Sequence, residues 1–197
     1  MPRPSLKDQR SREILDAFVS CAARYGIEGA TQERIAIEAG VKRTLLRHYL
    51  GNRDDMVEAL YIHVVGEFDV LTEMLDAALQ NCKQPSELID LLFDTNHATD
   101  PRLVLVFQAL TVRAETDPKM RSALLASMER FTAVIDSYLL RNVAGGAKTK
   151  SQAIAHGLAA LYMSSDALTP LDPPSQWRAA LKRAAFTLIN TMEAPSK

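Results

Sequence analysis

Apolar residues recur every three or four positions along most of the chain, which is the spacing of amphipathic helices. After residue 53 no stretch alternates apolar and polar residues as a strand would. An acidic residue followed by proline, at Asp100-Pro101 and Asp117-Pro118, marks two helix starts, because proline suits the first helical position. We therefore expect an all-α chain of about nine helices. Besides two short helices within 31–53, they are predicted at 6–25, 53–80, 85–97, 101–116, 118–142, 150–167 and 175–193.

The segment 31–53 has the most specific pattern, two short helices joined by a tight turn. Thr31 can accept a hydrogen bond from the free amides of the first short helix, and Gly40 can adopt the left-handed conformation that ends it. The two helices share one apolar face, formed by Ile35, Ala36, Ala39, Val41, Leu46 and Tyr49. This arrangement is a helix-turn-helix.

The second short helix turns basic and polar side chains away from this apolar face, as a helix that enters the major groove of DNA does. Arg53 lies at the start of the next helix, where it either binds a phosphate or pairs with a neighbouring carboxylate. The alternative for the whole segment is an ordinary surface hairpin with a charged face. The predicted DNA-binding residues are Thr31, Lys42, Arg43, Thr44, Leu45, Arg47, His48, Tyr49 and Arg53.

The flanking segments favour the DNA-binding interpretation. The amphipathic helix at 6–25, with Gly26 as its stop, supplies a third wall for the small core that two short helices cannot close alone. Asn52 and Asp55 form a capping pair that begins the following helix. We therefore predict a three-helix DNA-binding domain at 1–53 and a larger helical domain for effector binding and dimerisation at 54–197.

Positive charge is concentrated in residues 1–53, the predicted DNA-binding head, although the whole chain has a net charge of only -1. Residues 1–53 contain 10 Lys and Arg against 6 Asp and Glu, a net of +4, and residues 54–197 contain 13 against 18, a net of -5. Basic residues release counterions when they contact a phosphate backbone. Because one head of this charge binds DNA weakly, we expect two heads in a homodimer that contacts two half-sites.

These residues resemble the amino-terminal domain of the TetR family of transcriptional regulators. The resemblance covers about 50 residues, in the order YGIEGAT, ERIAIEAGV and RHYLGNRDDMVEAL. It implies a homodimeric regulator, usually a repressor, that binds a palindromic double-stranded operator and responds to a small molecule. Arg47 replaces the tyrosine usual in the family, and Leu45 replaces a frequent threonine. Arginine can still bind phosphate or guanine, and leucine can touch a thymine methyl group.

Two groups of residues in the larger domain are candidates for effector binding and dimerisation. A small apolar or amphipathic effector is expected to enter its core and shift the helix that follows the head. The candidate ligand residues are Phe93, His97, Phe107, Arg113, Phe131 and Tyr162, each of which is alternatively plain core. The candidate dimer residues are Ala153, Gly157, Ala160, Trp177, Leu181, Ala184 and Leu188, with burial inside one subunit as the alternative.

The sequence offers little for other classes of function. No paired Glu-x-x-His, glycine-rich phosphate loop or nucleophile elbow is present, so we expect no enzyme and no catalytic residue. Cys21 and Cys82 lack metal-ligand spacing, and no metal or cofactor is predicted. The longest uncharged run, 151–165, has 15 residues and is too short to span a membrane, so a cytoplasmic location is expected. The alternative function is a helical interaction protein whose head does not bind DNA.

Overall fold

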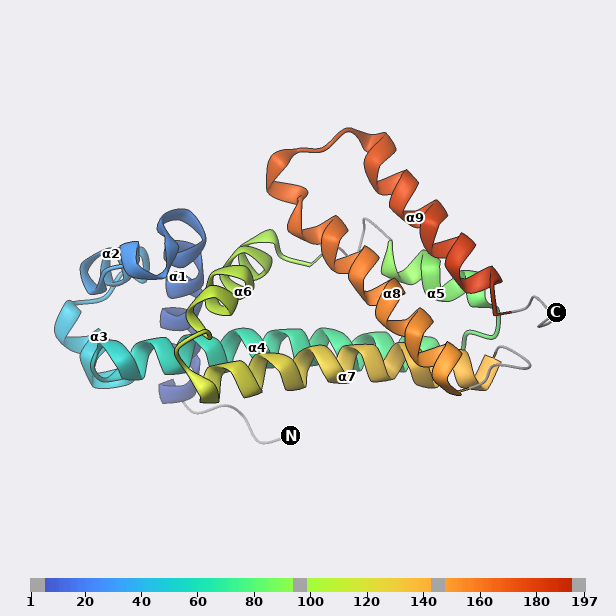
Figure 1. Cartoon of the computed structure of the whole chain (residues 1–197). Coiled ribbons are helices and arrows are strands. Elements are labelled where there is room, and N and C mark those ends of the chain that lie inside the picture. The colour runs from blue at the N-terminus through green and yellow to red at the C-terminus, as the bar shows by residue number, and fades with distance from the viewer. Residues whose placement is uncertain (1–5, 94–98, 143–147, 193–197) are drawn as a thin grey trace. The chain divides into compact units, whose positions relative to one another are not determined.

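The computed structural model describes residues 6–93, 99–142 and 148–192, and these ranges form nine α-helices and no strand. The α-helices are α1 (Leu6–Gly29), α2 (Gln32–Glu38), α3 (Arg43–Leu50), α4 (Arg53–Leu79), α5 (Pro85–Leu92), α6 (Pro101–Arg113), α7 (Pro118–Asn142), α8 (Lys148–Ala167) and α9 (Ser175–Asn190), with a 3-10 turn at Thr169–Leu171 (Figure 1). The predicted all-α fold with about nine helices is therefore confirmed. The ends predicted at residues 97 and 193 lie outside the described residues.

The chain divides into two compact units, residues 1–67 with 102–124 and residues 68–101 with 125–197. Helices α4 and α7 each contribute residues to both units. The predicted head at 1–53 lies wholly within the first unit, which also takes in the first part of α4 and most of α6.

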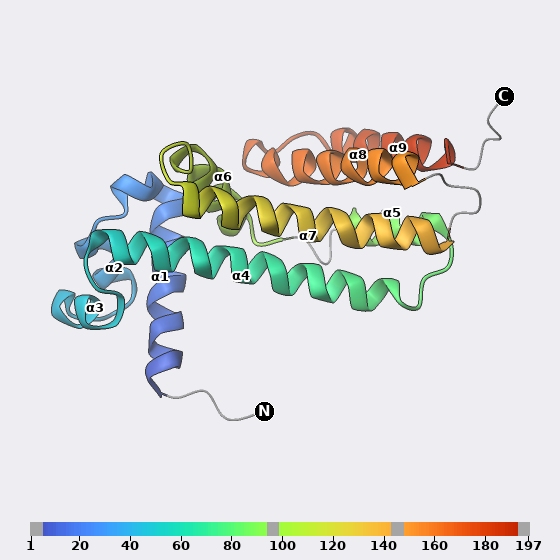
Figure 2. The same cartoon turned by 60° about the horizontal axis from the view of Figure 1, so that its bottom comes forward.

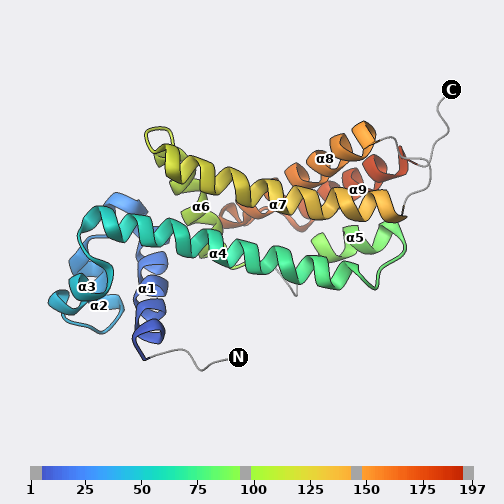
Figure 3. The same cartoon turned by 90° about the horizontal axis from the view of Figure 1, so that it is seen from below.

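In the first unit, helices α1, α2 and α3 pack together around one small core (Figure 3). Its fully buried side chains include Ile14, Phe18, Ile35, Leu46, Met56 and Leu60, so that each of α1 to α4 contributes apolar surface. Gly26 has φ 71° and interrupts α1, as the sequence predicted for a stop, although one further turn continues to Gly29. Because a residue with a side chain rarely adopts this conformation, glycine allows the chain to bend here.

Side-chain caps fix where the helices of the head begin. The Thr31 hydroxyl accepts a hydrogen bond from the Arg34 amide at 3.3 Å, as expected for the N-cap of α2. Asn52 Oδ1 accepts from the amides of Asp54 and Asp55, and Asp55 Oδ2 accepts in return from the Asn52 amide at 2.9 Å. The predicted capping pair at the start of α4 is confirmed, and it fixes the direction in which the chain leaves α3.

In the second unit, α8 and α9 lie side by side as a helical hairpin (Figures 1 and 2). The apolar core beneath them draws on the end of α4 and on α5, α7, α8 and α9, and includes Leu79, Leu88, Ile89, Ile135, Leu139, Ile154, Leu158, Ala185 and Ile189. A Cβ placed on Gly157 of α8 would lie 2.5 Å from Leu188 Cδ2 of α9, so the two helices approach closely at this point. Farther along, Asp69 of α4 accepts hydrogen bonds from Ser127 and Arg130 of α7.

Candidate nucleic-acid interface

Helix α3 has one buried edge and one fully exposed basic face. Leu46 and Leu50 are 0% and 7% exposed and anchor the helix in the core of the head. The side chains of the opposite face are all exposed, namely Lys42, Arg43, Thr44, Leu45, Arg47 and His48. A helix with buried leucines and an uncovered basic face can be laid against a DNA groove without any rearrangement of the head.

Two of the remaining predicted contacts, Thr31 and Tyr49, have structural partners of their own. Tyr49 is half-buried, and its ring stands nearly perpendicular to the His48 ring, with 5.3 Å between the ring centroids. Thr31 is exposed, and its hydroxyl oxygen is engaged with the Arg34 amide. A hydroxyl that accepts from a backbone amide still has a proton to donate, so Thr31 remains available to a phosphate oxygen.

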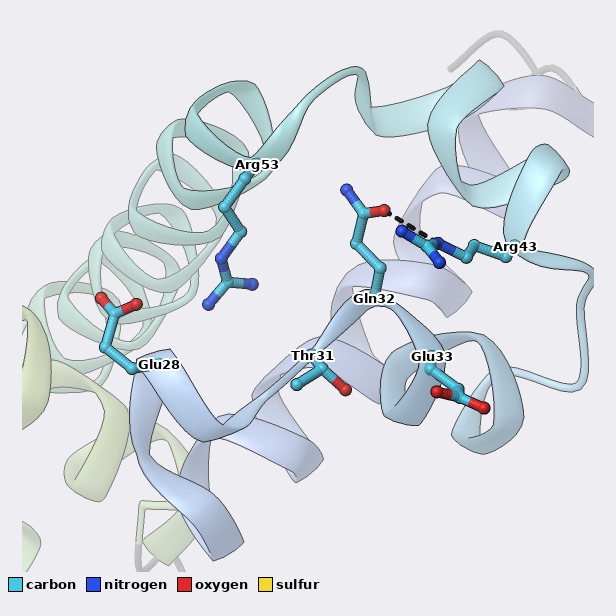
Figure 4. A pocket seen from close by; sticks show the side chains of 6 residues that line it. All are labelled: Glu28, Thr31, Gln32, Glu33, Arg43 and Arg53. Carbon is cyan, nitrogen blue, oxygen red and sulfur yellow. Dashed lines mark hydrogen bonds between the residues drawn. The ribbon is translucent and has the colours of Figure 1, made fainter.

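A polar hollow of about 410 Å³ opens where the starts of α2, α3 and α4 meet (Figure 4). It is lined by Glu28, Thr31, Gln32, Glu33, Arg43 and Arg53. Arg43 Nε donates a hydrogen bond to Gln32 Oε1 at 3.2 Å, which orients its guanidinium group. Gln32 was not among the predicted site residues, because the pairing joins two helices across a turn and leaves no signal in the sequence.

Arg53 is engaged with the backbone of the head. Its guanidinium group donates to the carbonyls of Ala30, at 2.8 Å, and Ile27, and it lies over the Phe18 ring with 5.4 Å to the centroid. Burial lowers the pKa of Arg53, and the nearby Glu28 carboxylate opposes this effect. These contacts fasten the start of α4 to the link between α1 and α2 and give Arg53 a structural role, and the phosphate contact considered from the sequence stays a prediction.

We expect Arg53→Met to destabilise the protein without removing a phosphate contact. Two carbonyl oxygens would lose a charged donor, at a cost of about 1–3 kcal/mol, and the melting temperature should fall by several degrees. The slope of log K against log salt for DNA binding should stay unchanged. Arg47→Met on the exposed face is the matched control, for which the slope should fall by about two, one for each subunit of a dimer, with no change in melting temperature. A reduced slope for Arg53→Met would instead identify Arg53 as a phosphate contact.

Helix α6 is tied to α1 within the first unit by two arginines. Arg102 Nη1 donates to the buried Ser20 hydroxyl at 2.7 Å, and Arg102 also pairs with Asp16 at 3.3 Å. Near the other end of α6, Arg113 forms an ion pair with Glu28. Arg113 was predicted to contact a ligand, and in the structure its guanidinium group is bound to the head.

Part of the chain is similar in sequence to a curated transcriptional regulator, although no family model matches the chain. The chain is 32% identical over 96 residues to the HTH-type transcriptional regulator BetI of Brucella canis, a match that covers 49% of this chain and 47% of BetI. The chain thus spans about half the length of the curated relatives it matches.

Solved structures match over nearly the whole chain. A TetR-family transcriptional regulator from Cytophaga hutchinsonii superimposes with a TM-score of 0.78 at 13% identity, covering 99% of this chain and 100% of the other. A putative TetR-family regulator from Mesorhizobium loti gives 0.74 at 17% identity, with coverages of 96% and 97%. The chain has the TetR-family fold. This fold is the one that the resemblance in the sequence of the head implied.

Within the TetR fold, the predicted ligand residues fall into separate groups. Phe93 is buried in the core of the second unit, and Phe131 and Tyr162 pack against that core with their ring centroids 5.5 Å apart. Phe107 and Arg113 belong to the first unit. His97 lies outside the described residues. The structure therefore brings together three of the six candidates, all of them aromatic.

The predicted dimer residues of the TetR fold divide between exposed and packed positions. Ala153, Ala160, Ala184 and Trp177 are exposed, and Trp177 retains 50% of its accessible surface. Leu181 is half-buried, whereas Gly157 and Leu188 pack against each other. The close approach of α8 and α9 explains, within a single chain, why a residue as small as Gly157 lies here. Burial inside one subunit was the alternative interpretation for these two helices.

Neither a cluster of metal ligands nor a membrane-spanning helix is present in the part of the chain that the structure describes. There, three or more His, Cys, Asp or Glu side chains nowhere gather in a way that could hold a metal ion. None of the described helices is long and apolar enough to cross a membrane.

Proposed function

We propose that the protein is a sequence-specific DNA-binding transcriptional regulator. The observation that carries this proposal is the exposed face of α3, where Lys42, Arg43 and Arg47 project from a helix anchored by buried leucines. The net charge of +4 on residues 1–53 supplies the electrostatic attraction to DNA. The TetR fold and the BetI relative, which is described as an HTH-type transcriptional regulator, support the same conclusion.

The regulator acts as a homodimer through α8 and α9. Ala153 and Ala160 lie seven residues apart on α8, and Trp177 and Ala184 lie seven apart on α9, so each pair follows one helical face. All four side chains are exposed in the single chain. A large aromatic ring beside small residues favours close packing against a second copy, which would form a four-helix interface and present two heads to a palindromic operator.

A small apolar or amphipathic effector releases the regulator from its operator. One solved structure with the same fold, EbrR, is described as a multidrug binding protein complexed with imidazole, with a TM-score of 0.61 and 17% identity. Helix α4 starts at the head and continues into the second unit, and α6 is joined to α1 through Arg102 and Arg113. A shift of either helix would change the spacing of the two α3 helices, on which operator binding depends.

Selection of bound duplexes from a random DNA library tests this proposal directly. A regulator should enrich a sequence with two related half-sites separated by about one helical turn, or a multiple of it, and should lose affinity steeply as salt rises. An interaction protein with a head that does not bind DNA should enrich no sequence at any salt concentration. That result would overturn the proposal.

A further inference from the structure

A small network of polar side chains lies in the second unit, at the edge of the apolar core. Arg178 of α9 and Asp166 of α8 form an ion pair with 3.6 Å between Nη1 and Oδ1, and their side chains are 25% and 10% exposed. The hydroxyl groups of Tyr162 and Thr99, 2.8 Å apart, also stabilise the charged form of Asp166. Burial nevertheless raises the pKa of this carboxyl group. A charged pair in such a place suggests a role beyond stability, since apolar residues often pack equally well there.

One hydrogen-bond donor of this network has no acceptor among the described residues. Arg178 Nη2 is buried and has no hydrogen-bond partner in the part of the chain that the structure describes. Arg178 Nε donates to the carbonyl of Phe93 at 3.4 Å, and Nη1 faces Asp166. A buried donor on a charged group is costly to leave unsatisfied, and an acceptor on a bound molecule would satisfy it.

The surroundings of the network are apolar and aromatic. Phe93 is buried in the core of the second unit, and Phe131 and Tyr162 lie at the border of that core with 5.5 Å between their ring centroids. A few polar groups beside apolar and aromatic side chains are typical of sites that orient a small molecule.

We propose that Arg178 Nη2 binds the polar end of the effector, and that this end is a neutral hydrogen-bond acceptor such as a carbonyl oxygen on an otherwise apolar molecule. Asp166 already neutralises Arg178, so a carboxylate would place an additional negative charge in a buried site. An ammonium group has no acceptor to offer to a guanidinium donor. This inference rests on the proposed function, because it assigns the chemistry of the effector.

Thermal-shift titration with three molecules of equal chain length tests the inference. The probes are 2-octanone, octanoate and octylamine, which carry a neutral, an anionic and a cationic head. We expect 2-octanone to raise the melting temperature most, because binding to the folded state stabilises it. In Arg178→Met the association constant for 2-octanone should fall about tenfold or more, because one hydrogen bond to a charged group is lost.

Lys182→Met is the matched control, because Lys182 lies one turn away on α9 and pairs with the exposed Asp90 at 2.7 Å. This variant should bind 2-octanone as the unchanged protein does. Because Arg178→Met leaves Asp166 unpaired, the double variant Arg178→Met/Asp166→Asn serves as a second test that avoids a buried lone charge and should show the same loss. Equal stabilisation by all three probes, no stabilisation by 2-octanone, or unchanged affinity in both Arg178 variants would overturn the inference.

The DNA selection distinguishes failure of the inference from failure of the proposed function. Arg178 lies outside the first unit, which contains the head, so Arg178→Met should select the same duplexes as the unchanged protein in the absence of probe. If the protein selects duplexes but its binding of the probe does not depend on Arg178, only the inference is contradicted. Absence of selection in the unchanged protein would contradict the proposed function itself.

Discussion

Replacing Arg43 and Arg47 together by alanine is expected to abolish operator binding at moderate salt while the fold stays intact. Both side chains are exposed on α3, and neither contributes to the buried core of the head. Arg43 also makes a hydrogen bond to Gln32, which holds its guanidinium group near the start of α2. The double substitution therefore removes two cations from each α3 helix, one of them oriented by Gln32, and changes little else.

The expected size of the effect follows from the number of contacts. An arginine that binds a base edge or a phosphate contributes about 1–3 kcal/mol, and a dimer has four of these arginines. Operator affinity should therefore fall on the order of a thousandfold or more. Gel shift or fluorescence anisotropy at several salt concentrations would measure both the affinity and its salt slope.

A matched control separates this effect from a general loss of positive charge. Arg141→Ala with Arg183→Ala removes the same charge from two exposed positions of the second unit. This control should bind the operator almost normally. Unchanged binding by the Arg43 and Arg47 double variant at moderate salt would show that α3 is not the recognition helix.

The helices were largely predictable from local sequence signals. The helix over 118–142 was predicted with the bounds that α7 has, because Asp117 and Pro118 mark its start unambiguously. The helix predicted to end at residue 116 ends at Arg113 instead. There the side chain of Arg121, from the next helix, donates to the carbonyls of Ala114 and Glu115 and stabilises the earlier end. A local sequence pattern does not reveal that a side chain of the next helix will bind these carbonyl groups.

The partners of individual charged side chains could not be predicted in the same way. Arg53 reaches carbonyls 23 and 26 residues earlier in the chain, and Arg113 reaches Glu28 across 85 residues. Helical periodicity states which face of a helix a residue occupies, and it does not state which other helix covers that face. The exposed basic face of α3 was predictable for this reason, because it has no covering helix and depends on local periodicity alone.

Introducing a charge at Ala184 is expected to separate the dimer and, with it, to abolish operator binding. Ala184 is exposed in the single chain, so Ala184→Glu should fold normally as a subunit. At a symmetric interface the substitution would bury two unpaired carboxylates, which costs several kcal/mol for each charge. Light scattering after size exclusion should show a monomer at micromolar concentration.

The loss of DNA binding follows from geometry, because each subunit has only one head. When two heads are joined, the second binds as an intramolecular event, which strengthens overall binding by about 10²–10⁴-fold. Ala184→Glu should lose affinity by this factor, although every residue of α3 is unchanged.

Ala179→Glu is the matched control for Ala184→Glu, because it makes the same chemical change on the same helix. Ala179 is also exposed and lies about 140° around α9 from Ala184. It should leave both the dimer and operator binding intact. A dimeric Ala184→Glu protein would place the interface on another surface, whereas a monomer that still bound the operator tightly would show that a single head suffices.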